Sequence, residues 1–283
     1  MTSPDTDLRH EVYGASPGRA LLGLLRAGGL RALGRLVGIS SWTVVCLIVL
    51  VSGHGVLVVA RRRRRRWRHR IVRRWARGLS WLVGMKVEIE GDPPPAPFFL
   101  VANHLSYVDI VLLLGMLDTV FVAKRELVDW PVIGYLARIT GTIFVDRRRA
   151  RDAVRVLESI DERIAGGEGV VLFPEGTSSR GDDVYPMRPA LFEWAVRSGF
   201  PVRAATIGYR SPPGGPPASE VICWWGDMSF LPHVIGLCRL PGFRAQVRFA
   251  GDPVVGTNRT DLARRARDVI SSGLIDAPRR ERA

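Results

Sequence analysis

The sequence predicts an α/β fold with a single mixed sheet covered by helices, preceded by an N-terminal membrane-associated helical segment. Three observations lead to this prediction. Short apolar runs alternate with helical patterns from Met85 onward, which is typical of a sheet packed against helices. The segment 37–60 carries no formally charged side chain, and a dense run of arginines follows it. We therefore divide the chain into four regions, 1–36, 37–84, 85–275 and 276–283.

The first region begins as a polar chain end. Residues 1–17 have the composition of a mobile tail. Residues 18–36 mix leucines with arginines, a composition compatible with an interfacial helix. The Gly28-Gly29 pair favours a break in such a helix, because glycine is a poor helix former.

The uncharged segment 37–60 is long enough to cross a membrane. A helix rising about 1.5 Å per residue would extend this segment over about 36 Å, which exceeds a hydrocarbon core. The segment is too long and too far from the N-terminus for a simple signal peptide. However, Ser52-Gly53-His54-Gly55 interrupts it, and glycine costs roughly 1 kcal/mol in a helix interior. A spanning helix and a bent helix that enters one leaflet therefore both remain open.

Residues 61–84 combine positive charge with an apolar stripe. Six arginines, Arg61–Arg66, open the segment, and apolar side chains recur along it at Trp67, Ile71, Trp75, Leu79 and Leu82. A basic helix with one aromatic and aliphatic face lies in a membrane interface. The alternative is an ordinary solvated helix. The positive-inside rule places this side in the cytoplasm, so we expect the following domain on the cytoplasmic face of the inner or plasma membrane.

The charge and cysteine content narrow the class of protein. The formal net charge is +14, which suits nucleic acid or an anionic membrane. Because many of the arginines follow the apolar segment directly and no folded recognition element is visible, the pattern favours the membrane and no nucleic acid. The three cysteines are odd in number and lack metal-ligand spacing, so they predict reduced thiols rather than a disulfide framework.

Residues 85–275 alternate between the two kinds of pattern. Strands are expected at 86–90, 97–102, 119–123, 141–145, 169–173, 202–208, 220–225 and 244–250. Helices are expected at 106–117, 150–165, 189–198, 229–238 and 260–272. The chain ends in a short tail, 276–283.

A histidine and an aspartate follow the end of the second predicted strand. The apolar run 97–102 leads into Asn103 and His104, and Asp109 comes within the first turns of the next helix. Sites in open α/β sheets form at the carboxyl ends of strands. The carboxylate is placed to accept the Nδ1–H of the imidazole, which leaves Nε2 free to take a proton. Such a pair suits deprotonation of a hydroxyl that attacks an acyl carbonyl.

Both residues also have a purely structural interpretation. Ser106-Tyr107-Val108-Asp109 fits the S-x-x-D variant of the capping box, which would make Asp109 a helix-start residue. His104 would then be a turn histidine with satisfied hydrogen bonds. For an isolated histidine and aspartate the structural interpretation is the more frequent one, and only the motifs at other strand ends reverse this preference.

Two further strand ends carry groups suited to bind an anion. The run 170–173 ends in a segment with a carboxylate, glycines, hydroxyls and an arginine, residues 174–181. Small residues let backbone N–H groups approach a ligand, and arginine binds phosphate through two hydrogen bonds. The strand 141–145 ends in Asp146-Arg147, which adds an arginine at the same edge. The implied substrate carries a phosphate and a hydroxyl, and no GxSxG motif offers a serine nucleophile.

Together these segments resemble the motifs of the glycerolipid acyltransferases. Residues 103–109 (NHLSYVD) resemble NHxxxxD, residues 173–181 (FPEGTSSRG) resemble FPEGTxSRG, and residues 141–147 (GTIFVDR) are similar to GxxFxDR. The motifs occur in the family order within residues 85–255. The resemblance is closest to the bacterial 1-acyl-sn-glycerol-3-phosphate (lysophosphatidate) acyltransferases, and it implies one acyltransferase domain.

The resemblance implies transfer of a fatty acyl chain from acyl-CoA or acyl-carrier protein to the free hydroxyl of 1-acyl-sn-glycerol-3-phosphate, giving phosphatidic acid. His104 would be the general base and Asp109 its orienting partner. The acceptor would be bound by residues in or near the matched motifs, namely Asn103, Lys124, Arg147, Glu175, Gly176, Thr177 and Arg180. Membrane lipids are the implied partners, and no metal or tightly held cofactor is implied.

Three departures from the family pattern bear on the acceptor. Ser178 stands where many members carry arginine, 188–190 replaces a common Lys-x-Gly, and Ala204 stands where a second proline is expected. The acceptor is therefore open between lysophosphatidate and another lysolipid such as lyso-ornithine lipid. Two other classes are weighed: a non-catalytic membrane-surface homologue that binds lipid, and a phosphoester hydrolase. The hydrolase lacks a metal-binding carboxylate set and a nucleophile motif.

Overall fold

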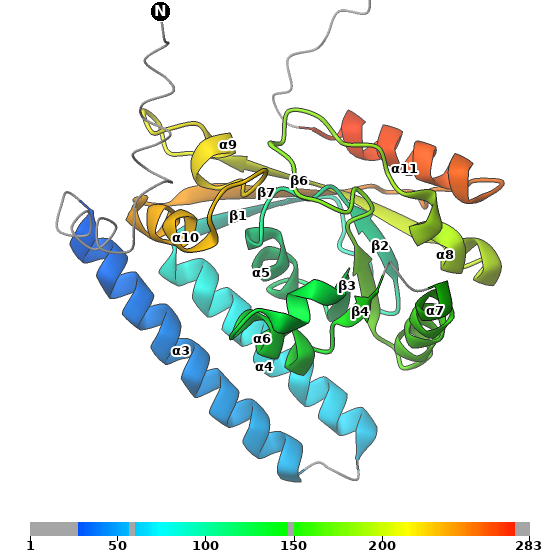
Figure 1. Ribbon diagram of the computed structural model, residues 1–283, viewed down its shortest axis with the longest axis horizontal. Coiled ribbons are helices and arrows are strands. Elements are labelled where there is room, and N and C mark those ends of the chain that lie inside the picture. The colour runs from blue at the N-terminus through cyan, green and yellow to red at the C-terminus, as the bar shows by residue number, and fades with distance from the viewer. Residues whose placement is uncertain (1–27, 57–59, 147–149, 275–283) are drawn as a thin grey trace, which may run out of the picture.

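The protein is built on one mixed sheet. The computed structural model describes residues 28–56, 60–146 and 150–274, and within them seven strands form a sheet in the order β1-β7-β6-β2-β5-β3-β4 (Figure 1). The α/β fold class is thereby confirmed. The predicted tails at 1–17 and 276–283, and the predicted site residue Arg147, lie outside the described residues.

Five neighbouring strands of the sheet run parallel. They are β2 (Phe99–Ala102), β3 (Thr119–Lys124), β4 (Ile143–Val145), β5 (Gly169–Leu172) and β6 (Val202–Arg210). β7 (Phe243–Phe249) pairs antiparallel with β6, and β1 (Met85–Glu90) completes this edge parallel to β7. The carboxyl ends of the five parallel strands therefore face one side of the molecule.

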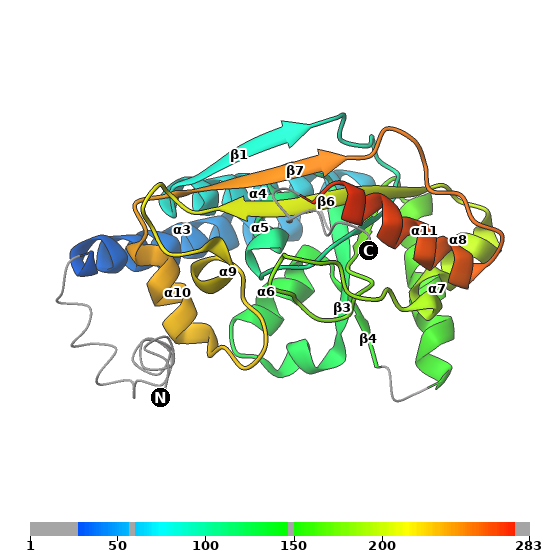
Figure 2. The ribbon, with the colours of Figure 1, turned by 90° about the horizontal axis from the view of Figure 1, so that it is seen from above.

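Both faces of the sheet are buried at the central strands β2 and β5, as their unbroken apolar runs require. In β2, Leu100 and Ala102 join one core cluster, whereas Phe99 and Val101 join the other. The first face is covered by α4 (Arg61–Leu82), α5 (Val108–Leu114) and α10 (Phe230–Arg239). The second face is covered by α7 (Ala150–Ala165), η2 (Pro189–Phe192), α8 (Glu193–Ser198) and α11 (Arg259–Ser272) (Figure 2).

The strand predicted at 220–225 is wrong. Its first residues belong to the short helix α9 (Ala218–Val221), and Ile222 and Cys223 are buried under the turn that carries His104. The backbone N–H of Trp224 donates to the carbonyl of Leu105 at 2.8 Å. A short apolar run records burial without recording the backbone geometry, so periodicity alone cannot separate this segment from a strand. The segment η1 (Arg125–Asp129) and α6 (Ile133–Thr140), between β3 and β4, were likewise not predicted.

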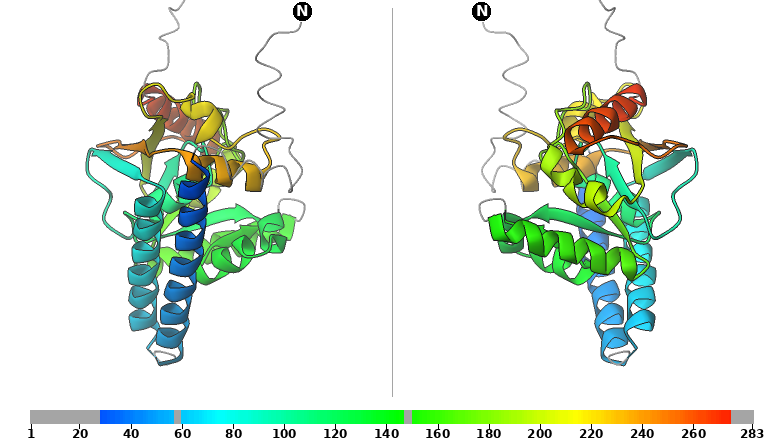
Figure 3. Two further views of the ribbon diagram at one scale, coloured as in Figure 1. Left: turned by 90° about the vertical axis from the view of Figure 1, so that its left-hand side faces the viewer. Right: turned by 90° about the vertical axis from the view of Figure 1, so that its right-hand side faces the viewer.

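The N-terminal segment forms a helical hairpin that projects beyond the sheet domain (Figure 3). α3 (Gly29–Val56) is one continuous helix, and α4 returns alongside it. Indole N–H groups join the two helices: Trp75 donates to the Thr43 hydroxyl at 3.0 Å, and Trp42 donates to the Trp75 carbonyl at 3.2 Å. By length and composition, Gly29–Gly55 is the one described helix that could cross a membrane.

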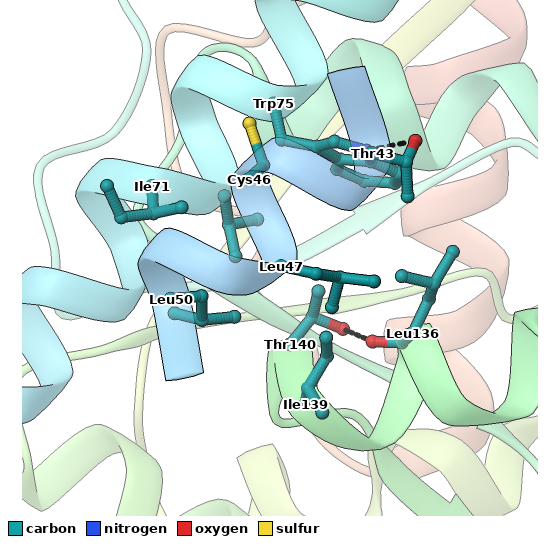
Figure 4. Close-up of a pocket in the computed structure, with 10 residues that line it drawn as sticks. Thr43, Cys46, Leu47, Leu50, Ile71, Trp75, Leu136, Ile139 and Thr140 are labelled. Carbon is teal, nitrogen blue, oxygen red and sulfur yellow. Dashed lines mark hydrogen bonds between the residues drawn. The ribbon is translucent and has the colours of Figure 1, made fainter. Parts of the chain in front are cut away.

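α3 continues through Gly53 without a break. The glycine instead allows α3 and α4 to pack closely. A Cβ atom at this position would lie 2.0 Å from Nε1 of Trp67 on α4, so only glycine admits the indole. Further along the hairpin, α6 packs into the angle between the two helices. Figure 4 shows the small apolar pocket at this junction, with Leu47 and Leu50 of α3 facing Leu136 and Ile139 of α6. The hairpin is therefore packed against the segment that joins β3 to β4.

Candidate active site

The turn that carries His104 is fastened to the sheet by Asn103. β2 ends at Ala102, and the buried side chain of Asn103 continues its pairing with β6. The Asn103 amide donates from Nδ2 to the Ile207 carbonyl at 2.9 Å, and the Ile207 N–H donates to Asn103 Oδ1 at 2.7 Å. Both polar ends of Asn103 are thus used to hold the chain immediately before His104.

The structure brings His104 and Asp109 together. Nδ1 of His104 lies 2.7 Å from Oδ2 of Asp109. The Asp109 side chain is fully buried, whereas the His104 side chain is 22% exposed. The imidazole also stacks on Phe173, with ring centroids 4.2 Å apart. A ring held on one edge by a carboxylate and on one face by an aromatic side chain presents Nε2 in a fixed direction.

Asp109 also fills the helix-start role that its sequence position suggested. The same Oδ2 atom accepts the backbone N–H groups of Leu105 at 2.7 Å and Ser106 at 3.0 Å, just before α5 begins. One buried carboxylate therefore orders the turn and the imidazole together. The structural and the chemical interpretations of this residue coexist.

Glu175 joins the loop after β5 to the His104 turn. One carboxylate oxygen accepts the N–H of His104 and the other accepts the N–H of Tyr185, both at 2.8 Å. The N–H of Ser179 donates to the His104 carbonyl, also at 2.8 Å. Burial raises the pKa of Glu175 to about 7, although the two N–H groups favour the charged form. Both motif loops therefore lie side by side at the carboxyl edge of the sheet.

The basic and hydroxyl groups of the predicted anion site differ in exposure. Thr177 and Lys124 are exposed, whereas Gly176, in the loop after β5, is buried. The Arg180 guanidinium lies 5.7 Å from the ring centroid of Trp225 and 3.6 Å from a carboxylate oxygen of Asp182. Lys124 ends β3 opposite Val145, the last residue of β4. Arg147, two residues further on, is outside the described residues.

Two parts of this site were missed by the sequence interpretation. Tyr209, on β6, donates to Asp109 Oδ1 at 2.6 Å. Trp224 and Trp225 follow α9 and pack beside Tyr107 and Arg180 respectively. The apolar run around these tryptophans was visible, but it was assigned to a strand. Tyr209 lies in a predicted strand-end region without a motif, and only the pairing of β6 with β2 places it near Asp109.

Comparisons with known proteins define the class of the protein. The Acyltransferase family pattern matches residues 85–208. The fold is similar to the crystal structure of the 1-acyl-sn-glycerophosphate (LPA) acyltransferase PlsC from Thermotoga maritima. The TM-score is 0.61 at 22% identity, covering 86% of this chain and 96% of that one.

Relatives in sequence specify the family further. The chain is 32% identical to lyso-ornithine lipid O-acyltransferase of Pseudomonas aeruginosa over 91% of this chain and 94% of that protein. It is 34% identical to the protein of the same name from Rhizobium meliloti over 74% and 77%. It is 31% identical to 1-acyl-sn-glycerol-3-phosphate acyltransferase of Neisseria meningitidis over 52% and 58%. The chain therefore belongs to the acyltransferase family, among the acyltransferases of lysophospholipids and related lysolipids.

Proposed function

We propose that the chain moves a fatty acyl group from acyl-CoA or acyl-carrier protein to the hydroxyl of a lysolipid. His104 is the general base and Asp109 orients it. Nε2 takes the hydroxyl proton, and the oxygen attacks the thioester carbonyl. The tetrahedral intermediate then expels the thiolate, which leaves as a thiol with the proton from the imidazolium. The single observation that carries the proposal is the 2.7 Å contact between Nδ1 and a fully buried carboxylate.

The two loops beside the imidazole divide the remaining work. Asn103 and Glu175 hold the backbone on either side of His104, since their polar atoms bond to main-chain groups. Backbone donors near Gly176 or at the start of α5 stabilise the oxyanion. Thr177, Arg180, Lys124 and Arg147 bind the acceptor head group. No metal or bound cofactor takes part in the proposal.

We favour lyso-ornithine lipid as the acceptor over lysophosphatidate. Ornithine is a diamino acid, so its lipids carry an ammonium beside a carboxylate, whereas lysophosphatidate carries a phosphate of charge near −2. Arg180 already has a carboxylate partner in Asp182, and Ser178 stands where many members have an arginine. A site with both signs of charge suits the zwitterionic head group better. The extended similarity to lyso-ornithine lipid O-acyltransferases supports the same choice.

The hairpin attaches the domain to one leaflet of the membrane. Apolar side chains on α3, among them Val44, Ile48 and Val51, are exposed. The side chains of Arg62, Arg63, Arg64 and Arg66 on α4 are exposed beside the last turns of α3, where the Trp67 indole N–H donates to the Leu50 carbonyl at 3.4 Å. If α3 crossed the bilayer with α4 packed beside it, the arginines further along α4, among them Arg70, Arg73 and Arg74, would enter the hydrocarbon at roughly 2.5–3.5 kcal/mol each. We therefore favour insertion along one leaflet, with the catalytic domain on the cytoplasmic side.

Acyl transfer is tested with purified protein, a panel of lysolipids and both donor types, with products identified by mass spectrometry. Loss of the base should lower turnover by roughly 10²–10⁴. His104→Ala is therefore expected to give no measurable product, while its thermal unfolding temperature stays close to that of the wild type. Near-normal turnover by His104→Ala would exclude the mechanism. If no donor is consumed with any lysolipid, a non-catalytic lipid-binding role becomes the better interpretation, and phosphate release would favour a hydrolase.

The acceptor is tested with a matched pair of variants. Asp182→Asn removes the carboxylate beside Arg180, so kcat/KM for lysophosphatidate relative to lyso-ornithine lipid should rise by up to about fivefold, as expected for an exposed charge pair. The control is Asp183→Asn, because the Asp183 carboxylate instead lies 3.6 Å from Arg267 on α11. An unchanged ratio in Asp182→Asn, or wild-type preference for lysophosphatidate, would contradict the acceptor assignment.

A further inference from the structure

The carboxylate of Asp109 is held from two sides. Oδ2 bonds to the His104 ring and to two backbone N–H groups, whereas Oδ1 accepts the hydroxyl of Tyr209 at 2.6 Å. Because Asp109 is fully buried, protein donors replace the water that would otherwise solvate this charge. Without Tyr209, one of its two oxygens would lose its donor.

Tyr209 is suited to act as a permanent donor. Burial, together with the charge of Asp109, raises the pKa of Tyr209 well above its usual value, so the phenol keeps its proton. Hydrogen bonds from a hydroxyl to a carboxylate are among the short and strong ones. The ring also packs edge-on against Phe243, with centroids 6.0 Å apart, which fixes the direction of the hydroxyl.

The β2–β6 pairing brings Tyr209 to this position. Asn103 is clamped to Ile207, and Tyr209 is two residues further along β6. Alternate residues of a strand lie on the same face, so Ile207 and Tyr209 both face the core that contains α5. The residue that fastens the catalytic turn therefore also sets the register that delivers the phenol to Asp109.

We propose that Tyr209 is a positioning residue of the acyl transfer: its hydroxyl fixes the Asp109 carboxylate, which in turn fixes the plane and tautomer of the His104 ring. The inference rests on the proposed function, because it assumes that His104 takes the acceptor proton. The hydroxyl also draws negative charge away from the carboxylate. Asp109 consequently holds a protonated imidazole less strongly than a bare carboxylate would.

The test is Tyr209→Phe, assayed as kcat and KM for both substrates and as the pH profile of kcat/KM. We expect kcat to fall about tenfold with both KM values unchanged, because loosened orientation affects the reaction rather than binding. We also expect the acid limb of the profile to move to higher pH. Without the Tyr209 hydroxyl, the Asp109 carboxylate stabilises the His104 imidazolium more strongly, and His104 must lose this proton before it can act as a base. The other titratable groups near His104 and Asp109 are Tyr107, Glu175, Asp182 and Cys223. They are present in the wild type and in Tyr209→Phe alike.

The matched control is Thr206→Val on the same strand. The Thr206 hydroxyl is buried and donates to the Ile270 carbonyl of α11 at 2.9 Å, on the opposite face of the sheet. This variant should lose stability while keeping kcat and the acid limb of the wild type. If Tyr209→Phe behaves like Thr206→Val, the hydroxyl is only structural and the inference is overturned.

A second replacement covers the case in which Tyr209→Phe does not fold. Incorporation of 3-fluorotyrosine at position 209 keeps the shape and the hydrogen bond but makes the hydroxyl a stronger donor. The acid limb should then move to lower pH, and an unmoved limb would overturn the inference. Failure of the proposed function is distinguishable, because in that case either the wild type consumes no acyl donor or His104→Ala itself retains turnover.

Discussion

Single residues in this site carry more than one task. Asp109 caps the turn before α5 and also binds the imidazole through the same oxygen. Both carboxylate oxygens of Glu175 accept backbone N–H groups, one from His104 and one from Tyr185. The carboxylate therefore holds two loops together rather than facing the acceptor directly. A motif records that a residue type is needed, but it does not say whether the side chain binds a ligand or another loop.

Glu175 provides a prediction at this scale. Glu175→Gln places an amide N–H₂ against one of two backbone N–H donors, so the His104 turn should loosen. We expect kcat to fall by about tenfold to a hundredfold with little change in KM for the acceptor. Thr177→Ala, at the exposed neighbour, should raise that KM instead. Steady-state kinetics separate the two, and a KM effect for Glu175→Gln would indicate direct acceptor contact.

The hairpin of α3 and α4 shows how one element combines opposite chemistries. The apolar side chains of α3 and the arginines of α4 suit the two depths of a membrane interface. Glycine at position 53, which suggested a break from the sequence, instead admits the Trp67 indole between the helices. The pocket shared with α6 then ties the hairpin to the β3–β4 connection (Figure 4).

Membrane binding through α3 is the prediction for this element. Ile48→Glu places a charge on a side chain that is 61% exposed, and it should weaken binding to vesicles with anionic lipid by about tenfold or more. Vesicle co-sedimentation measures this loss. The control is Val154→Glu, at a similarly exposed position on α7 in the opposite helix layer. Equal binding by wild type and Ile48→Glu would contradict attachment through α3.

At the scale of the whole molecule, a buried charge network joins the hairpin to the sheet domain. Glu168, just before β5, contacts Arg68 and His69 of α4, and Arg163 of α7 lies 3.2 Å from its second oxygen. The Glu168 side chain is only 3% exposed. Breaking such a pair leaves a buried charge uncompensated, so this network couples the helical hairpin to the strand that precedes the Glu175 loop.

These charges predict how stability depends on pH. Burial alone raises the pKa of Glu168, but His69 and Arg68 outweigh burial and lower it to about 2. Burial lowers the pKa of His233 to about 4. Each lowered pKa adds to the free energy of unfolding. The Glu168 contribution is complete above its unfolded pKa of 4.5, and the His233 contribution is complete above 6.5. Each is lost as the pH falls from that value through the folded pKa. Glu175, with its pKa raised to about 7, contributes in the opposite direction, fully below 4.5 and less as the pH rises.

We therefore expect the free energy of unfolding to change little between pH 6.5 and 4.5, where His233 and Glu175 oppose each other. Below pH 4.5 it should fall, with a Glu168 contribution on the order of 3 kcal/mol. Chemical denaturation across this range measures the profile. The stability difference between wild type and Glu168→Gln should shrink toward pH 2, whereas Glu88→Gln, at a partly exposed pair with Arg244, should stay near wild type throughout. A pH-independent difference for Glu168→Gln would contradict the assignment.

The sequence by itself determined the α/β class, the apolar and basic N-terminal segments and the family. Apolar runs that end near His104, Glu175 and Asp146 are local signals. Because the carboxyl ends of parallel strands lie at one edge of the sheet, these residues are expected near one another whatever the conformation of the loops. The order of the strands was not available, because pairing depends on contacts between segments far apart in the chain. The run 220–225 shows the same limit, since burial without register does not define a strand.

The tertiary structure alone decided how the site is held. Tyr209 reaches Asp109 from 100 residues away because β6 pairs with β2, and Glu175 reaches the His104 turn because β5 lies on the other side of β2. The sequence does not identify the hydrogen-bond partner of either residue, because a hydrogen bond depends on distance and direction rather than on spacing along the chain. Local patterns therefore predicted His104, Asp109 and the motif loops, whereas strand pairing added Tyr209 to the site and determined which groups touch.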